Sequence, residues 1–161
     1  MIKAGIIGST GYAGQELVRL LMQHPDVEIV WYGSRSYIDQ QYADVFQNMF
    51  QIVDAKCMDD NMDALADAAD VIFTATPQGL CASLVNEDVL NKVKIIDLSA
   101  DFRIILVEVY ETWYGIKHKS PSYIKDAVYG LCDNNREDIN GARLIAYPGC
   151  YSTSPTLTFH P

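Results

Sequence analysis

Short apolar runs alternate with amphipathic stretches along most of this chain. The first run, residues 3–8, is apolar on both faces and ends in glycine, which predicts a buried strand. A stripe of leucine and valine at helical spacing follows, ends before Pro25, and leads into a second apolar run at 27–32. A strand, a helix and a strand within about 30 residues indicate a right-handed parallel crossover.

The alternation continues through the rest of the sequence. In chain order it predicts a strand at 53–58, a helix at 60–69, a strand at 71–76, a helix at 79–91, a strand at 93–98, a short helix at 134–140 and a short strand at 144–146. Residues 101–122 break the periodicity and predict a long loop packed through its aromatic side chains. Strands that alternate with helices predict an α/β fold with a doubly wound, mostly parallel, Rossmann-like sheet.

Composition narrows the classes of function. The chain has 161 residues, 49% of them hydrophobic, and its formal net charge of -9 has the wrong sign for a nucleic-acid binder. No apolar run approaches the roughly 20 residues that cross a bilayer, and no signal peptide is recognisable. The cysteines are widely spaced without a C-x-x-C pair, which predicts free thiols and no metal site. We therefore expect a soluble, cytoplasmic protein without nucleic-acid or membrane partners.

A glycine-rich segment follows the first predicted strand and opens the first predicted helix. It consists of Gly8, Ser9, Thr10, Gly11, Tyr12, Ala13 and Gly14. Small residues let the backbone approach a dinucleotide pyrophosphate, whose charge the helix N-terminus favours. The spacing is a variant of G-x-G-x-x-G, and the alternative is that the glycines only close a tight turn. The surrounding strand, helix and strand favour cofactor binding.

The choice between NAD and NADP depends on the end of the second predicted strand, where a carboxylate binds the ribose of NAD and an arginine accommodates the 2′-phosphate of NADP. No Asp or Glu occurs here before Asp39, whereas Arg35 stands between Ser34 and Ser36. This pattern favours NADP(H). The alternative is that Arg35 is a solvated loop residue, and on the chemistry of these residues alone the two interpretations have comparable weight.

Cys150 is the strongest candidate for a nucleophile. Pro148 and Gly149 favour a tight turn after a strand, so Cys150 is expected near the N-terminus of the next helix, where free N–H groups favour a thiolate. The alternative is a small buried hydrophobe, the usual state of a free cysteine. We expect that buried state for the other three cysteines, Cys57, Cys81 and Cys132.

A nucleophilic cysteine needs a proton-transfer partner, typically histidine. His24 ends the first predicted helix, and His118 belongs to a basic segment that we expect to be solvated. His160 follows Cys150 by ten positions, which in a helix means about 15 Å and a different face. The chain is therefore expected to carry a nucleophile without its base.

Polar residues also follow the predicted strand at 93–98, at the sheet edge where ligands bind in such folds. Arg103 is a candidate for a bidentate phosphate contact, and Ser99 is a candidate hydrogen-bond donor. The alternative is a surface arrangement of Asp101 and Arg103 with little energetic weight.

Taken together, these segments resemble the N-acetyl-gamma-glutamyl-phosphate reductase family in order and spacing. The matching motifs are residues 8–17, 75–79, 97–103, 129–131 and 148–151. The resemblance implies NADPH-dependent reduction of N-acetyl-glutamyl 5-phosphate, a small-molecule acyl phosphate, to its semialdehyde in arginine biosynthesis. It implies that Cys150 forms a thioester, that Thr76 and Pro77 join the cofactor site, and that Ser99 and Arg103 lie at the phosphate end of the cleft.

The chain departs from this family in two ways. Asp133 and Ser152 stand where members usually have Glu and Pro, and members are about twice as long. Residues 1–148 are then expected to be the dinucleotide-binding domain and 149–161 the start of a second, α+β domain that brings the histidine and the homo-oligomer interface. Alternatives are a stand-alone NADP-binding or regulatory module and an enzyme resembling aspartate-semialdehyde dehydrogenase.

Overall fold

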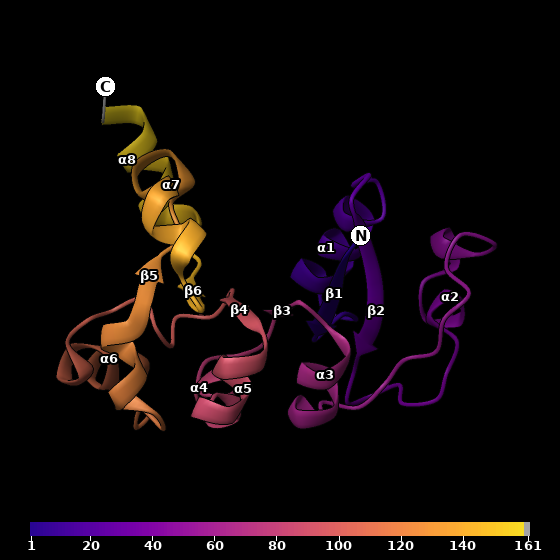
Figure 1. Cartoon of the computed structure of the whole chain (residues 1–161), viewed down its shortest axis with the longest axis horizontal. Coiled ribbons are helices and arrows are strands. Elements are labelled where there is room, and N and C mark those ends of the chain that lie inside the picture. The colour runs from indigo at the N-terminus through magenta and orange to yellow at the C-terminus, as the bar shows by residue number, and fades with distance from the viewer. Residues whose placement is uncertain (160–161) are drawn as a thin grey trace. The chain divides into compact units, whose positions relative to one another are not determined.

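A computed structural model describes residues 1–159. The chain divides into two compact units, Met1–Ala75 and Thr76–Pro161, each with its own parallel strands and helices (Figure 1). None of the helices within the described residues is long and apolar enough to span a membrane. The predicted boundary at 148/149 lies inside the second unit, and it stays a prediction.

The first unit starts with the predicted strand, helix and strand. Its elements are β1 (Ile2–Ile7), α1 (Tyr12–Leu21), β2 (Val27–Gly33), α2 (Tyr42–Val45), the 3-10 helix η1 (Gln47–Met49), α3 (Met62–Ala68) and β3 (Val71–Thr74). The central strand β1 pairs in parallel with β2 on one side and with β3 on the other. This order matches the predicted crossover, since parallel neighbours require a helix between them.

The second unit is also built on parallel strands. Its elements are α4 (Cys81–Leu84), α5 (Glu87–Lys92), β4 (Lys94–Asp97), α6 (Val107–Tyr114), the 3-10 helix η2 (Pro121–Asp126), β5 (Ala127–Tyr129), α7 (Cys132–Gly141), β6 (Leu144–Ala146) and α8 (Cys150–Phe159). Strand β6 pairs in parallel with β4 and with β5. The α/β class with parallel pairing is therefore confirmed in both units.

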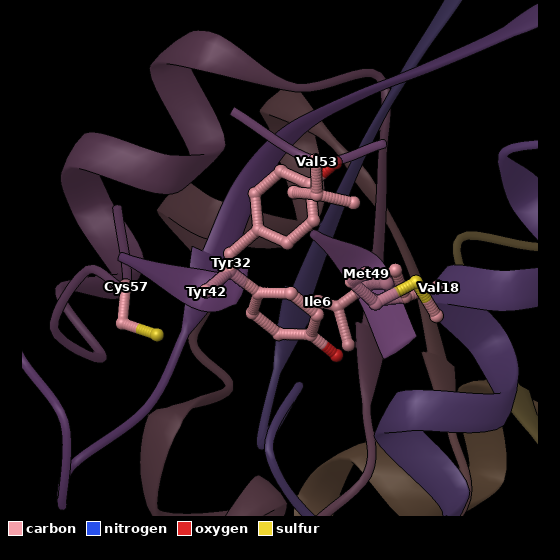
Figure 2. Packing of buried hydrophobic residues seen from close by; sticks show 7 residues of the cluster. All are labelled: Ile6, Val18, Tyr32, Tyr42, Met49, Val53 and Cys57. Carbon is pink, nitrogen blue, oxygen red and sulfur yellow. The ribbon is translucent and has the colours of Figure 1, made fainter. Parts of the chain in front are cut away.

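A buried cluster beneath the glycine-rich segment forms the core of the first unit (Figure 2). Its members are Ile6, Val18, Tyr32, Tyr42, Met49, Val53 and Cys57. The rings of Tyr32 and Tyr42 lie 5.1 Å apart, and the Tyr42 hydroxyl donates to the carbonyl of Ser9 at 2.9 Å. Burial raises the pKa of Tyr42, which therefore remains a neutral donor. The core thus holds the segment above it in place.

Two predicted elements are wrong. Residues 53–58 are not a strand: they make only single bridges, Met58 with Gly33 and Lys56 with Gln41, because Val53 and Cys57 are buried in the cluster rather than in a sheet. The predicted helix at 79–91 is two helices. Asn86 separates them, since its side chain accepts a hydrogen bond from the amide of Val89 at 2.9 Å and caps α5.

The aromatic stretch at 101–122 is not a loop throughout, because it contains α6. Tyr110 is the one buried residue of this helix, so the sequence carries no apolar stripe that would reveal it. Helix α6 ends at Gly115, whose φ of 66° is left-handed. The short strand β5 was also absent from the prediction, because its three residues are only partly buried and show no alternation.

The Gly14→Ala variant should be strongly destabilised. A Cβ atom at Gly14 would lie 2.1 Å from the carbonyl oxygen of Gly8, and backbone on both sides prevents relaxation. We expect the free energy of unfolding to fall by about 1–3 kcal/mol or more, measured by urea denaturation. The matched control is Gly141→Ala, where a Cβ meets nothing within 4 Å. Equal denaturation midpoints for the two variants would contradict this account.

Candidate functional site

The glycine-rich segment is tied to the end of β2. The amides of Gly8 and Ser9 both donate to the carbonyl of Gly33, at 3.0 and 2.8 Å, and the Ser9 hydroxyl donates to the same oxygen at 3.0 Å. Gly8 has a φ of 81°, a conformation that other residues rarely adopt. Ser9 is fully buried, so its side chain stabilises the turn from the interior of the unit.

The N-terminus of α1 has no side-chain cap. Gly11 occupies the cap position and has no side chain to cap the helix, and no acidic residue lies in the first turn. Within residues 1–159, the amides of Tyr12, Ala13 and Gly14 donate to no acceptor. Because Gly14 lacks a Cβ, the helix can start against the turn, and its free amides are aligned with the helix dipole. This arrangement fits a pyrophosphate.

Residues 34–36 follow β2 and lie beside the glycine-rich segment. The hydroxyls of Thr10 and Ser34 are 2.7 Å apart, and Ser34 is buried. The side chains of Arg35 and Ser36 are exposed, and Arg35 forms an ion pair with Asp60. The sequence interpretation missed Asp60, which had been assigned to a helix that starts only at Met62. The spacing rule for dinucleotide-binding folds considers only residues about 20 positions after the last glycine, so it does not identify a carboxylate from a later loop.

In the second unit, Thr76 and Pro77 precede a turn that is held by a buried carboxylate. Asp101 accepts hydrogen bonds from the amides of Gly79 and Ala82, at 2.7 and 2.9 Å, and from the hydroxyl of Tyr110 at 2.8 Å. Burial and this contact with Asp101 raise the pKa of Tyr110. Asp101 is therefore a structural anchor rather than a surface residue.

The side chain of Thr76 does not use its hydrogen-bonding capacity within the described residues. Its hydroxyl oxygen is buried, and within the described part of the chain it has no hydrogen-bond partner. Pro77 is exposed. A buried hydroxyl without a partner costs free energy, so Thr76 is available to a ligand that brings a hydrogen-bonding group.

Ser99 is buried between two acids. Its hydroxyl donates to Asp97 at 2.8 Å and accepts from the amide of Asp101 at 3.1 Å. Ser99 is 4% exposed, and its hydroxyl could donate to a ligand, as predicted, only if its bond to Asp97 were given up. Its contact with substrate stays a prediction.

Arg103 lies against the turn that carries Cys150. Its Nε donates to the carbonyl of Tyr147 and its Nη2 to the carbonyl of Ser99, both at 2.8 Å. A Cβ at Gly149 would lie 2.6 Å from Nη1, and Gly149 has a φ of 83°. The structure therefore brings the side chain of Arg103 and the backbone of Ser99 together with the turn before Cys150.

Cys150 is exposed and is the first residue of α8, as predicted for a residue at a helix N-terminus. Cys57 and Cys81 are buried, as expected for small hydrophobes, and burial raises the pKa of the Cys57 thiol. The expectation of burial is wrong for Cys132, which is exposed because it begins α7 at the surface.

Two of the three histidines, His24 and His118, lie within the described residues. The prediction that His118 is solvated is wrong, because its side chain is only 8% exposed. Its Nε2 lies 2.6 Å from the carbonyl of Asp101, and its Nδ1 accepts from the amide of Ser120 at 3.2 Å. Both ring nitrogens are therefore engaged. His24 does not end the first helix, because α1 ends at Leu21; it lies in the following turn, where its Nδ1 accepts from the amide of Asp26 at 3.2 Å. His160 lies outside the described residues.

The chain is similar in sequence to known proteins along its length. The family described as "Semialdehyde dehydrogenase, NAD binding domain" matches residues 3–142. The chain is 69% identical over its whole length to an N-acetyl-gamma-glutamyl-phosphate reductase of Lachnoclostridium phytofermentans and 67% identical to one of Lachnospira eligens. It covers 46% and 47% of those proteins, so it spans about half the length of the curated relatives it matches.

Two solved structures share the fold. An aspartate semialdehyde dehydrogenase from Francisella tularensis aligns with a TM-score of 0.58 at 16% identity, covering 91% of this chain and 36% of that one. The enzyme from Candida albicans, solved with NADP, aligns with a TM-score of 0.51 at 20% identity and covers 73% of this chain and 40% of that one. These likenesses confirm the Rossmann-like prediction.

The two exposed cysteines allow a matched test of the predicted nucleophile. Cys132 and Cys150 are each the first residue of a helix, but the first turn of α7 contains Asp133, whereas that of α8 contains no acidic residue. A helix N-terminus favours a thiolate, and a nearby carboxylate opposes it. We expect iodoacetamide at pH 7 to alkylate Cys150 about two to five times faster than Cys132, as measured by peptide mass spectrometry. Faster alkylation of Cys132 would contradict the assignment.

Proposed function

We propose a function from the premise that this chain belongs to the semialdehyde dehydrogenase family, whose NAD-binding domain it contains. The chain would be the cofactor-binding half of an NADPH-dependent N-acetyl-gamma-glutamyl-phosphate reductase. The observation that carries this proposal is the open N-terminus of α1, with amides free for a pyrophosphate. The names of the relatives, matched along the whole chain, support the choice of substrate.

The cofactor would be held by residues 8–14 and by residues 34–36. The amides at the start of α1 would bind the pyrophosphate, while Ser34 and the guanidinium of Arg35 would bind the 2′-phosphate. Thr76 and Pro77 are further proposed contacts, and the unpartnered hydroxyl of Thr76 supports a role for that residue. NADPH bound there would supply the hydride that reduces the acyl group to the level of an aldehyde.

Cys150 would act as the nucleophile. Its thiolate would attack the carbonyl carbon of the acyl phosphate, forming a carbon–sulfur bond, and the carbon–oxygen bond to phosphate would break as inorganic phosphate leaves. The position of Cys150 at the start of α8 supports this role, because the helix N-terminus favours the charged form of a thiol. Arg103, packed against the preceding turn, would carry positive charge to the leaving phosphate.

The alternatives make different predictions. A stand-alone NADP-binding module would bind the cofactor but leave Cys150 no more reactive than Cys132. An enzyme acting on aspartyl phosphate would share the thioester chemistry, and the structural likeness to aspartate semialdehyde dehydrogenases extends to the fold alone. The names of the relatives at 69% and 67% identity favour the acetyl-glutamyl substrate.

Other expectations remain part of this proposal. The whole protein would be cytoplasmic and would assemble as a homo-oligomer, with a small acyl phosphate as its substrate and no nucleic acid among its partners. The net charge of -9 supports the last point. In this proposal Asp133 has no assigned role.

The test is a titration of the chain with NADPH and NADH, followed by nucleotide fluorescence. We expect NADPH to bind more tightly than NADH, and Arg35→Ala to weaken NADPH binding about tenfold or more, because a charge-assisted hydrogen bond to phosphate is lost. NADH binding should change little. The matched control is Arg19→Ala, which removes an exposed arginine paired with Glu16 in the same unit. Equal affinity for both nucleotides in the wild-type chain would contradict the NADP assignment.

A further inference from the structure

We propose that Asp60 is a specificity-determining positioning residue that holds the Arg35 side chain ready for the 2′-phosphate of NADP(H). The proposal rests on the proposed function, because it deepens the description of the same cofactor site. It concerns a residue that does not touch the cofactor itself. Its basis is the ion pair between Asp60 and Arg35, together with the way the backbone around each of the two residues is held.

The backbone before Asp60 is fastened to the end of β2. Met58 donates its amide to the carbonyl of Tyr32 at 2.9 Å and accepts from the amide of Ser34 at 2.7 Å. The carbonyl of Asp59 accepts from the indole N–H of Trp31 at 2.9 Å. These hydrogen bonds align residues 58–60 with the last residues of β2, immediately before Arg35.

The backbone after Asp60 is fastened as well. The Asp59 carboxylate accepts from the amide of Asn61 at 3.1 Å, and the Asn61 side chain caps α3 by accepting from the amide of Ala64 at 3.1 Å. Asp60 therefore stands between a strand end and a helix start that are both held by hydrogen bonds. A carboxylate in such a position has little freedom to move.

Arg35 is held at one end and free at the other. Its Nε donates to Oδ2 of Asp60, and within residues 1–159 its Nη1 and Nη2 have no hydrogen-bond partner. The Arg35 side chain is 63% exposed, whereas that of Asp60 is 11% exposed. The two terminal nitrogens of a guanidinium can donate to two oxygens of one phosphate, so the open end of Arg35 suits a 2′-phosphate.

The charge of Asp60 has no other compensation among the described residues. Its second oxygen, Oδ1, is buried and without a hydrogen-bond partner. A carboxylate largely removed from water favours any cation within reach, so Asp60 draws Arg35 into one orientation before the cofactor arrives. An exposed arginine otherwise loses side-chain freedom when it binds, and prior orientation reduces that loss.

The experiment is a double-mutant cycle on nucleotide affinity with Asp60→Asn and Arg35→Ala, singly and combined. Dissociation constants for NADPH, NADH and 2′,5′-ADP are measured by calorimetry on the 161-residue chain. We expect Asp60→Asn to weaken NADPH and 2′,5′-ADP about two- to tenfold and to leave NADH unchanged, because only the 2′-phosphate meets Arg35. In the Arg35→Ala background the same substitution should have no further effect.

Two further variants separate orientation from general effects. Asp60→Glu keeps the charge and should retain part of the preference for NADPH, which also covers the case in which Asp60→Asn fails to fold. The matched control is Asp44→Asn, which neutralises an exposed carboxylate in α2 of the same unit and should leave every affinity unchanged.

Three results would overturn the inference. Tighter NADPH binding by Asp60→Asn would mean that Asp60 repels the phosphate instead of orienting Arg35. Equal weakening of NADPH and NADH, or an effect that persists in the Arg35→Ala background, would indicate a merely structural role. In these cases the wild-type chain still binds NADPH and the proposed function stands. Binding of neither NADPH nor 2′,5′-ADP by the wild-type chain would remove both proposals together.

Discussion

Helix α1 can begin just after β1 only because Gly14 has no side chain. A Cβ there would lie 2.1 Å from the carbonyl oxygen of Gly8, so any other residue would push the first turn of the helix away from the strand end. Within residues 1–159, the amides of Tyr12, Ala13 and Gly14 in that turn donate to no acceptor. Close backbone packing at the carboxyl edge of the parallel strands thus gives the uncapped helix start that the proposed pyrophosphate site requires.

The second unit is organised by buried carboxylates. Asp101 is fully buried and accepts three hydrogen bonds, two from amides at the start of the α4 region and one from Tyr110 of α6. Ser99 links it to Asp97, and Arg103 extends from the same segment to the turn before Cys150. One segment after β4 therefore connects the turn at Thr76 and Pro77 with the turn that carries the exposed thiol.

The sequence was sufficient for the features that depend on local pattern. Apolar runs gave the strands of the first unit, and Gly149 before Cys150 correctly indicated a helix start at the thiol. The sequence was insufficient where tertiary packing determines whether a segment forms a strand. Val53 and Cys57 read as a strand, but their side chains fill the cluster beside Tyr42 instead.

Long-range contacts were the other limit. Asp60 reaches Arg35 from 25 positions away, and His118 is buried by Asp101 and by the rings of Phe102 and Tyr110 rather than being solvated with its lysine neighbours. Neither contact leaves a periodic trace in the sequence. The sequence therefore nominates the glycines, the arginines and the cysteine of the candidate site, whereas the residues that position them are visible only in the structure.

In the proposed function, the uncapped first turn of α1 binds the pyrophosphate of NADP(H). The most direct test is a ¹⁵N–¹H NMR titration of the chain with NADPH, read at the backbone amides. We expect the largest shift changes at Thr10, Tyr12, Ala13 and Gly14, together with the side-chain Nε–H of Arg35. Binding that leaves these signals unmoved and shifts amides elsewhere would contradict this proposal.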